Sequence, residues 1–343
     1  MELKKLHTED TEVAIGFAES RIGGRQENQD SYGAANTKRG FLVTVCDGMG
    51  GGPGGKTAST IAVKEIVAGV DESNDDETIP NVIIKAVRRA NMAILEEGNK
   101  TPSLRGMGST ATVLLITEQS AFVAHVGDSR VYQLRGKKKV FRTFDHSQVF
   151  ELVKQGIITE EVARLAANSN IITRALGIAP DVEVDIQELP YEKGDRFLLC
   201  SDGIHGMMPE KNLIKMVTNK KVSLGVVVDD VATFVDDEGR TNGGGHDNLT
   251  IALLELKTNS KLKVKMSKLT KIVLWVLAAI CAVSLCLNIV QLTGSKPDPQ
   301  LILKDSVAVW NKKDSVYKSD IKNLNDSIAK LNEKISKVEK AIK

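Results

Sequence analysis

Eight short runs of apolar and β-branched residues recur between positions 12 and 256, and they restrict the possible folds more than any other feature. The runs are EVAIGFA, FLVTVC, ATVLLIT, AFVAHVG, VYQLR, EVDIQEL, RFLLCS and LTIALLEL. Some neighbours are separated by only three residues, such as 118–120, which allows a hairpin but not a helical crossover. Helical patterns appear over 57–70, 79–97, 147–155, 159–167 and 222–236. The sequence therefore predicts an α+β fold, an antiparallel β-sandwich flanked by helices in the order α-β-β-α.

The stretch CDGMGGGPGGKTAS, residues 46–59, offers a competing interpretation. Gly50 and the triplet Gly-Lys-Thr at 55–57 have the spacing of a phosphate-binding loop between a strand and a helix. Asp202 in RFLLCSD would then be the second metal-holding carboxylate of a nucleotide hydrolase. That class needs a parallel sheet of βαβ units, whereas the short connections favour antiparallel hairpins. We therefore expect no nucleotide here, and an exposed Lys56 near the start of a helix.

Aspartates stand at the ends of the apolar runs or in glycine-rich turns. They are Asp47 in VCDGMGG, Asp128 in HVGDSR, Asp202 in LLCSDG, Asp247 in GGHDNLT and, earlier, Asp30 in RQENQD. A carboxylate beside glycine at the end of a buried strand is held rigidly yet is reachable by water, as a hard cation requires. One such aspartate alone would indicate a turn. Five in similar settings predict a metal site.

These motifs resemble the type-2C family of metal-dependent serine/threonine protein phosphatases, above all its bacterial members. The matching segments are RQENQD, CDGMGGGPGGKTAS, GMGSTATVLLI, AHVGDSRVYQL, DHSQVFELVKQGIITEEV, NIITRALG, GDRFLLCSDGIHGMM and GGHDNLTIALLEL, in the family's order. The resemblance covers about residues 12–256. It implies a β-sandwich with two Mn²⁺ or Mg²⁺ ions in a cleft, a third ion as in bacterial relatives, and hydrolysis of phosphoserine and phosphothreonine on proteins.

The resemblance gives five of these positions a role in metal binding. Asp47 corresponds to the carboxylate that bridges both ions, and the backbone carbonyl of Gly48 corresponds to a ligand of one of them. Asp202 and Asp247 look like ligands of the other ion. Asp128 looks like the ligand of the third, weaker ion.

Two further positions resemble the family's contacts to substrate and water. Arg25 lies where the family holds the substrate phosphate, and a guanidinium can bind two phosphate oxygens at once. Asp30 lies where the family orients the attacking water. Two divalent cations would lower the pKa of that water and neutralise the phosphate, so that attack needs no covalent intermediate. A catalytically dead phosphoprotein-binding module is the alternative, but such a module would lack a metal-ligand aspartate, and none is lost.

The sequence departs from the family around these positions. Met49 replaces a histidine of eukaryotic members, so that water or solvent must protonate the leaving group. Gln29 replaces an acid, and Gly52 and Lys56 replace a histidine and a glutamate of bacterial relatives. The flap before NIITRALG reads LAANS instead of His-Pro with an arginine, so the family's flap contacts to substrate are not carried over.

The charge distribution and the cysteines restrict the partners and the covalent or metal sites that can be expected. Residues 257–343 hold 17 lysines and 7 acidic residues, net +10, which leaves residues 1–256 at net −8. Such a domain suits cations and lacks the basic, aromatic-interleaved face of a nucleic-acid binder, so no nucleic-acid partner is expected. Cysteines at 46, 200, 281 and 286 have neither metal-site nor disulfide spacing, and we expect buried apolar roles for them. His125 and His246 are expected to be structural, in the core or a loop.

Residues 272–292 form an uncharged stretch of 21 residues, IVLWVLAAICAVSLCLNIVQL, long enough to cross a bilayer as one helix. A buried core helix is the alternative. Six lysines between 257 and 271 precede it, and the positive-inside rule then places residues 1–271 in the cytoplasm and the C-terminus outside the cell membrane.

Apolar residues repeat in heptads from Leu303 to the end. One core position holds mostly isoleucine and the other mostly leucine or an aromatic residue, which predicts a parallel coiled-coil homodimer. An amphipathic helix on another surface is the alternative.

The predicted organisation is a phosphatase domain (1–256), a basic juxtamembrane linker (257–271), a transmembrane helix (272–292), a linker (293–302) and an extracytoplasmic coiled coil (303–343). Expected partners are phosphorylated proteins and an antagonistic serine/threonine kinase.

Overall fold

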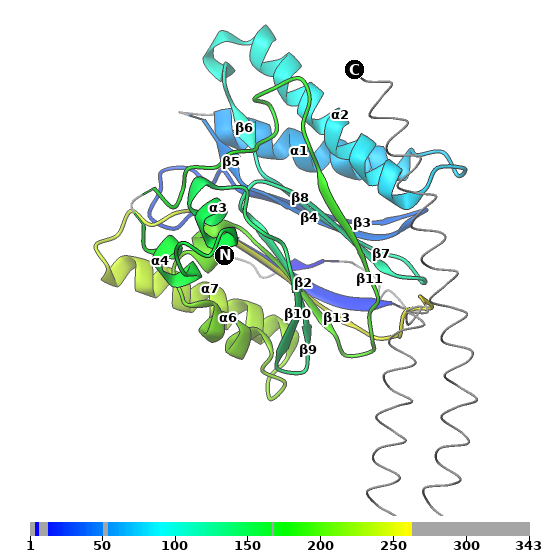
Figure 1. The fold of residues 1–343 in the computed structure, drawn as a ribbon, viewed down its shortest axis with the longest axis vertical. Coiled ribbons are helices and arrows are strands. Elements are labelled where there is room, and N and C mark those ends of the chain that lie inside the picture. Colours follow the sequence, from blue (N-terminus) through cyan, green and yellow to red (C-terminus); the bar gives the residue numbers. More distant parts are fainter. Residues whose placement is uncertain (1–3, 7–12, 51–53, 167, 263–343) are drawn as a thin grey trace, which may run out of the picture. The chain divides into compact units, whose positions relative to one another are not determined.

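The computed structural model describes residues 4–6, 13–50, 54–166 and 168–262. Two antiparallel sheets pack face to face (Figure 1), and every strand pairing in this part of the chain is antiparallel. In spatial order, the first sheet contains β1 (Lys4–Lys5), β2 (Ala14–Arg21), β13 (Leu249–Leu256), β12 (Arg196–Cys200), β9 (Arg130–Arg135) and β10 (Lys138–Arg142). The second contains β11 (Asp185–Leu189), β8 (Ala121–Val126), β7 (Ala111–Ile116), β4 (Gly40–Cys46) and β3 (Ser31–Thr37). A short ribbon pairs β5 (Gly48–Met49) with β6 (Gly108–Ser109).

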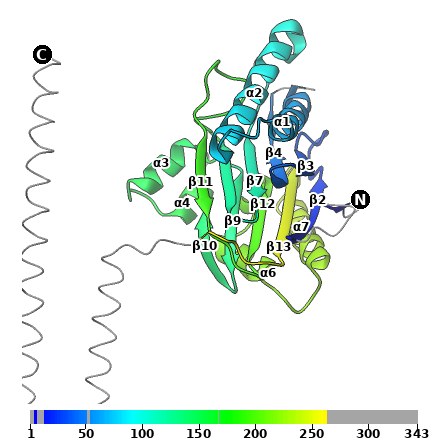
Figure 2. The same cartoon turned by 90° about the vertical axis from the view of Figure 1, so that its right-hand side faces the viewer.

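Helices cover both outer faces of the sandwich. In Figure 1, α1 (Gly54–Asp71) and α2 (Ile79–Lys100) lie over the second sheet, and α6 (Glu210–Val217) and α7 (Leu224–Thr241) lie under the first. The short helices α5 (Asp202–His205) and η1 (Pro102–Leu104) follow β12 and α2. Figure 2 shows the same layers from the side. The predicted α-β-β-α order is therefore confirmed for the described residues.

Strand alternation divides the apolar residues among three cores. In β4, Phe41, Val43 and Val45 face the space between the sheets, whereas Leu42 and Cys46 face α1 and α2. Side chains of a strand alternate between its two faces, so a strand buried on both faces needs a continuous apolar run. This is why FLVTVC, RFLLCS and LTIALLEL show no polar alternation: each of these strands contributes to two cores.

The antiparallel neighbours of β4 exclude the nucleotide-hydrolase fold. Its partners are β3, with Ser31 opposite Cys46, and β7, with Phe41 opposite Ile116. The sheet that precedes the glycine loop therefore has no parallel βαβ unit, and the Gly-Lys-Thr triplet opens α1 in a different fold class.

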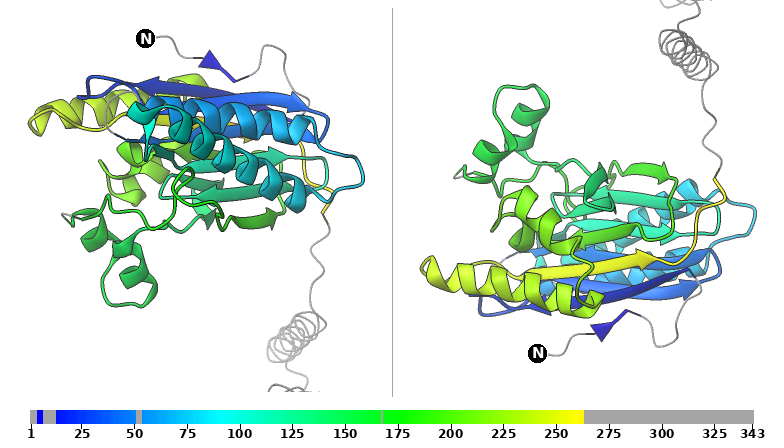
Figure 3. Two further views of the ribbon diagram at one scale, coloured as in Figure 1. Left: turned by 90° about the horizontal axis from the view of Figure 1, so that it is seen from above. Right: turned by 90° about the horizontal axis from the view of Figure 1, so that it is seen from below.

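Two helices that stand apart from the layers form the flap, which we define as residues 143–178. Figure 3 shows α3 (Gln148–Lys154) and α4 (Glu160–Arg164) projecting beside the sandwich. Ser147 and Thr159 cap them, because their hydroxyl oxygens accept from the N–H groups of Phe150 and Val162.

Not every predicted segment falls within the described residues. Among those described, no helix has both the length and the apolarity to cross a bilayer. The predicted transmembrane helix at 272–292 and the predicted coiled coil at 303–343 lie outside the described part. Cys46 and Cys200 are free and buried, as expected.

Candidate active site

Strand direction brings the predicted aspartates together. Because each antiparallel neighbour reverses direction, β4, β8 and β12 end, and β3 and β13 begin, at one end of the sandwich. Asp47 follows β4, Asp128 follows β8, Asp202 follows β12, Asp30 precedes β3 and Asp247 precedes β13. Residues far apart in the chain therefore meet at one edge.

A cavity of about 700 Å³ lies at this edge. Six of the seven predicted site residues line it: Arg25, Asp47, Gly48, Asp128, Asp202 and Asp247. The seventh, Asp30, is buried, and its Oδ2 accepts a hydrogen bond from Ser201 Oγ over 2.7 Å. These aspartates lie at the ends of strands from both sheets, so the site lies across the edge of the sandwich.

Burial and mutual repulsion shape the electrostatics of these carboxylates. Burial, with the charge of Asp247 added, raises the pKa of Asp202 to about 7 and the pKa of Asp30 to about 6. Burial raises the pKa of Asp47 well above its usual value, and the charges of Asp30 and Asp202 add to the rise. Burial and the charge of Asp202 do the same for Asp128. A multivalent cation among these groups would offset both the repulsion and the burial cost.

The donor atoms suit hard cations. One oxygen each of Asp30 and Asp202, the Oδ1 in both cases, is buried and has no hydrogen-bond partner among the described residues. Carboxylate and carbonyl oxygens without sulfur or imidazole donors favour Mn²⁺ or Mg²⁺ over Zn²⁺. The residues at this edge therefore fit the predicted ions.

Thr110 holds the main chain at Asp47. The Asp47 N–H donates to Thr110 Oγ1 over 2.9 Å, and the Thr110 N–H donates to the Asp47 carbonyl over 2.8 Å. Thr110 Oγ1 also lies 2.8 Å from Ser129 Oγ, in the turn that carries Asp128. A side chain at Gly48 would place Cβ 2.0 Å from the carbonyl oxygen of Gly55, so only glycine fits between the Asp47 loop and α1.

The loop that carries Arg25 is tied to the residues before β13. Arg25 Nη2 donates to Asp247 Oδ2 over 2.9 Å, and both side chains are about half exposed. Asn248 Oδ1 accepts from the Gln29 N–H over 2.8 Å, and its Nδ2 donates to the Ile22 carbonyl over 2.7 Å. Asn248 thus fixes the 22–29 loop next to a predicted metal ligand.

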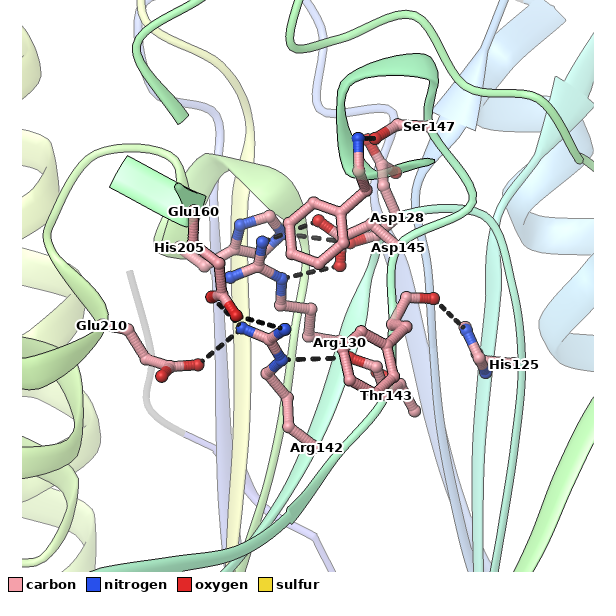
Figure 4. Close-up of polar contacts among 12 residues, drawn as sticks. His125, Asp128, Arg130, Arg142, Thr143, Asp145, Ser147, Glu160, His205 and Glu210 are labelled. Atoms are coloured by element: carbon pink, nitrogen blue, oxygen red, sulfur yellow. Dashed lines mark hydrogen bonds and ion pairs between the residues drawn. The ribbon is translucent and has the colours of Figure 1, made fainter. Parts of the chain in front are cut away.

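Buried polar contacts support the turn at Asp128 (Figure 4). His205 Nε2 donates to the Asp128 carbonyl over 3.0 Å, and Arg130 forms two hydrogen bonds with Asp145, of 2.7 and 2.6 Å. Burial and the charge of Arg130 lower the pKa of His205 to about 3, so its ring stays neutral. Burial opposes ionisation of Asp145, but Arg130 outweighs it and lowers the pKa of that carboxyl.

Arg142 joins the flap to the sandwich. It pairs with Glu160 at the start of α4, and its Nη1 donates to Glu210 Oε1 in α6 over 2.8 Å, as Figure 4 shows. The ring of Phe150 in α3 lies 5.2 Å from the guanidinium carbons of both Arg130 and Arg142. The flap also lines the cavity, through residues 170 and 172.

The fold and this site agree with comparisons against known proteins. The sequence profile named protein phosphatase 2C matches residues 19–242. The chain belongs to the protein phosphatase 2C family. It is 34% identical over 235 residues to the serine/threonine phosphatase stp of Listeria innocua, an alignment that covers 67% of this chain and 91% of that protein.

Solved structures give the same result. Serine/threonine phosphatase Stp1 from Staphylococcus aureus is 27% identical with a TM-score of 0.65, over 71% of this chain and 94% of that one. The catalytic domain of PstP in complex with two manganese ions is 29% identical with a TM-score of 0.60, over 71% and 99%. This chain is a metal-dependent protein serine/threonine phosphatase, as predicted. The predicted cofactor, Mn²⁺ or Mg²⁺, is confirmed for its family.

Two of the residues that depart from the family pattern lie in the cavity of this phosphatase. For a third, Lys56, the predicted exposure is wrong. Met49 and Gln29 line the cavity. Lys56 is not exposed, as the sequence had led us to expect, but half-buried. Its Nζ donates to the Asp30 carbonyl over 2.7 Å, because α1 begins directly against the residues that precede β3.

The two histidines have structural contacts. His246 lies in the loop before β13, and its Nε2 is 2.9 Å from Asp236 Oδ1 in α7. His125 stacks on His146 with ring centroids 4.4 Å apart, and its Nε2 donates to the Phe144 carbonyl.

His125, His146 and Asp185 have ligand atoms within 4.8 Å of one another, which resembles a cation site. Two contacts oppose it. The Gly127 N–H donates to His146 Nδ1, so the proton of a neutral ring sits on Nε2, the nitrogen that faces Asp185. The guanidinium of Arg174 lies 3.3 Å from that nitrogen and 2.8 Å from Asp185. In this phosphatase these contacts connect β11 to the flap.

Several residues that support the site have no role in the sequence prediction. Thr110 and Asn248 lie inside the motifs GMGSTATVLLI and GGHDNLTIALLEL. Their place in these motifs could have predicted that they support the metal site. Ser201 directly precedes Asp202. Arg130 and Asp145 gave no local signal, because they meet only when β10, which the sequence did not predict, pairs with β9.

Proposed function

We propose that this phosphatase hydrolyses phosphoserine and phosphothreonine on proteins through a binuclear Mn²⁺ or Mg²⁺ centre, as a membrane-anchored enzyme that opposes a serine/threonine kinase. The observation that carries the proposal is the meeting of four aspartates and Arg25 around one cavity at the ends of both sheets.

Asp47 would bridge the two ions, with the Gly48 carbonyl on one ion and Asp202 and Asp247 on the other. Asp128 would hold a third ion more weakly. Two such cations lower the pKa of a water and neutralise phosphate charge. The carboxylates supply the negative charge that retains them, and the contacts of Thr110 and Ser201 keep two loops in place.

Arg25 would bind the substrate phosphate. In the structure its guanidinium pairs with Asp247 at the exposed side of the cavity. An exposed pair of this kind contributes only about 0–1 kcal/mol, so a phosphate dianion can replace it with two charge-assisted hydrogen bonds. Asp30 would orient the attacking water from its buried position beside Ser201. Met49 has no proton to give, so the departing serine or threonine oxygen takes its proton from water.

The described residues end at the side of the domain opposite this cavity. Asp247 lies just before β13, and eight residues of strand, about 25 Å, separate it from the other end. There Lys261 and Leu262 donate to the carbonyls of Glu118 and Gln119 in the β7–β8 turn.

Calorimetric titration of the metal-free chain with Mn²⁺ tests the centre. We expect two tight sites in the wild type, loss of both in Asp47→Asn, and two remaining tight sites in Asp128→Asn. Two tight sites in Asp47→Asn would contradict the bridging role.

Cell fractionation tests the anchor. The full chain should sediment with membranes, and a deletion of 272–292 should not. A full chain found in the soluble fraction would contradict the proposed location.

A further inference from the structure

Lys56 contacts the residues that carry Asp30. Its Nζ donates to the Asp30 carbonyl over 2.7 Å and to Ser31 Oγ over 3.0 Å. It reaches them from the first turn of α1, next to the close contact between Gly48 and Gly55. The lysine that completes the apparent phosphate-binding motif therefore contacts the Asp30 carbonyl and the Ser31 side chain of the phosphatase itself.

Ser59 makes a second connection from the next turn of the same helix. Its hydroxyl donates to the Gln29 carbonyl, and its oxygen lies 2.9 Å from Ser31 Oγ. Two side chains of α1 thus hold three consecutive residues, 29–31. These residues join the Arg25 loop to β3.

The position of the Asp30 carboxylate depends on this segment. The side chain is short and buried, so it moves with its backbone. One oxygen accepts from Ser201, and the other has no partner among the described residues. A shift of the main chain at Asp30 would therefore move this free oxygen relative to Asp47 and Asp202.

The helix itself disfavours a cation at this place. Lys56 lies in the first turn of α1, which contains no acidic residue, and the amino end of a helix is positive. Burial lowers the pKa of Lys56, whereas the charges of Asp30 and Glu27 act in the opposite direction. The charges of Asp30 and Glu27, and not the helix, therefore favour the positive charge of Lys56.

We infer that Lys56 is a positioning residue for Asp30, because its ammonium holds the Asp30 carbonyl and the Ser31 hydroxyl against α1 and so sets where the Asp30 carboxylate lies. The inference rests on the proposed function of the site. It gives Lys56 a task in phosphate ester hydrolysis without any contact to substrate.

The test compares full-length Lys56→Met and Lys56→Arg with wild type, using p-nitrophenyl phosphate and Mn²⁺. Lys56→Met should lower kcat about 10- to 100-fold, as loss of a residue that orients an active-site group does, with KM changed less than about twofold. Lys56→Arg keeps the charge and the donors, so it should restore most of kcat. Lys64→Met on the same helix is the matched control, because Lys64 is exposed.

Amide hydrogen exchange of the metal-free chains gives a readout that does not depend on activity. Exchange at residues 29–31 should accelerate in Lys56→Met and stay unchanged in Lys64→Met. If Lys56→Met unfolds, Ser59→Ala removes the neighbouring contact and should show the same two effects.

The possible results separate the inference from the proposed function. A folded Lys56→Met variant with wild-type kcat and wild-type exchange at 29–31 would overturn the inference alone. A lowered melting temperature with unchanged kcat would show a structural role only, and would overturn it as well. A wild type without Mn²⁺-dependent hydrolysis would overturn the proposed function, and this inference with it.

Discussion

Arg25 and Asp247 form an ion pair of 2.9 Å between the loop that precedes β3 and the residues that precede β13. The pair joins the predicted phosphate contact to a predicted metal ligand on the wall of one cavity. Both side chains are about half exposed, so the pair holds Arg25 in place without burying it.

Replacement of Arg25 should weaken substrate binding. Arg25→Ala removes a bidentate, charge-assisted contact of about 1.5–3 kcal/mol, so kcat/KM should fall about 10- to 100-fold. Arg25→Lys should recover little, because an ammonium cannot make the paired contact. Steady-state kinetics with a phosphothreonine peptide measure the effect, and Arg88→Ala, on α2 away from the cavity, is the control. Wild-type kinetics in Arg25→Ala would remove this residue from the phosphate site.

The metal-free protein should lose stability as pH rises through the carboxylate pKa values. The folded-state pKa values of Asp30 and Asp202, about 6 and about 7, lie above the usual value of 3.8. The folded state therefore binds more protons than the unfolded state between about pH 4 and pH 7, so these groups lower the free energy of unfolding progressively over that range. Mn²⁺ should reverse the loss.

Asp202→Asn isolates this effect. It should raise the melting temperature of the metal-free chain at pH 8 by about 4 °C and change it little at pH 4. Differential scanning calorimetry of both chains in EDTA measures the difference. A variant that is less stable than wild type at pH 8 without metal would contradict the repulsion between these carboxylates.

Weakening the contact between the flap and the sandwich should reduce the hydrolysis of large substrates most. Glu160→Gln weakens the pairing of α4 with the buried guanidinium of Arg142, whose other partner, Glu210, lies in α6. We expect kcat/KM to fall about tenfold for a phosphoprotein and less than about threefold for p-nitrophenyl phosphate, since a phosphoprotein extends beyond the cavity toward α3 and α4 and p-nitrophenyl phosphate does not. Proteolysis within 155–166 should also become faster. Glu161→Gln, whose pairing with Arg164 is exposed, is the control, and an equal loss for both substrates would contradict a positioning role of the flap.

The sequence allowed the central strands and the metal-site aspartates to be predicted, because both have local signals. An apolar run buried on two faces marks β4, β12 and β13, and an aspartate with glycine marks where such a run ends. The edge strands β3 and β10 were missed. SYGAANT lacks an apolar run, and KKVFR carries the charges that edge strands tolerate.

Contacts between distant segments could not be predicted. Lys56 looked like an exposed helix residue because nothing in its neighbourhood shows that α1 begins against Asp30. The contacts of Ser201 with Asp30 and of Arg130 with Asp145 likewise depend on which strand ends meet. The helix α6 was also missed, since its eight residues include only two that are buried.

The C-terminal heptads predict self-association, which lies outside the described residues. A peptide of residues 300–343 should be helical and dimeric, with helicity that rises with concentration, and Ile328→Lys should abolish the dimer because it places a charge at a core position. Analytical ultracentrifugation and circular dichroism measure both properties. A monomer at high micromolar concentration would favour a different helix as the partner.

Hydrolysis of a phosphothreonine peptide by the full chain, with Mn²⁺ and then with EDTA, tests the metal site most directly. We predict turnover that requires Mn²⁺ or Mg²⁺, and a loss of several orders of magnitude in Asp47→Ala and in Asp202→Ala, because each removes a carboxylate that would hold the ions. Full activity in EDTA, or wild-type turnover in Asp47→Ala, would contradict the assignment of this cavity as the catalytic metal site.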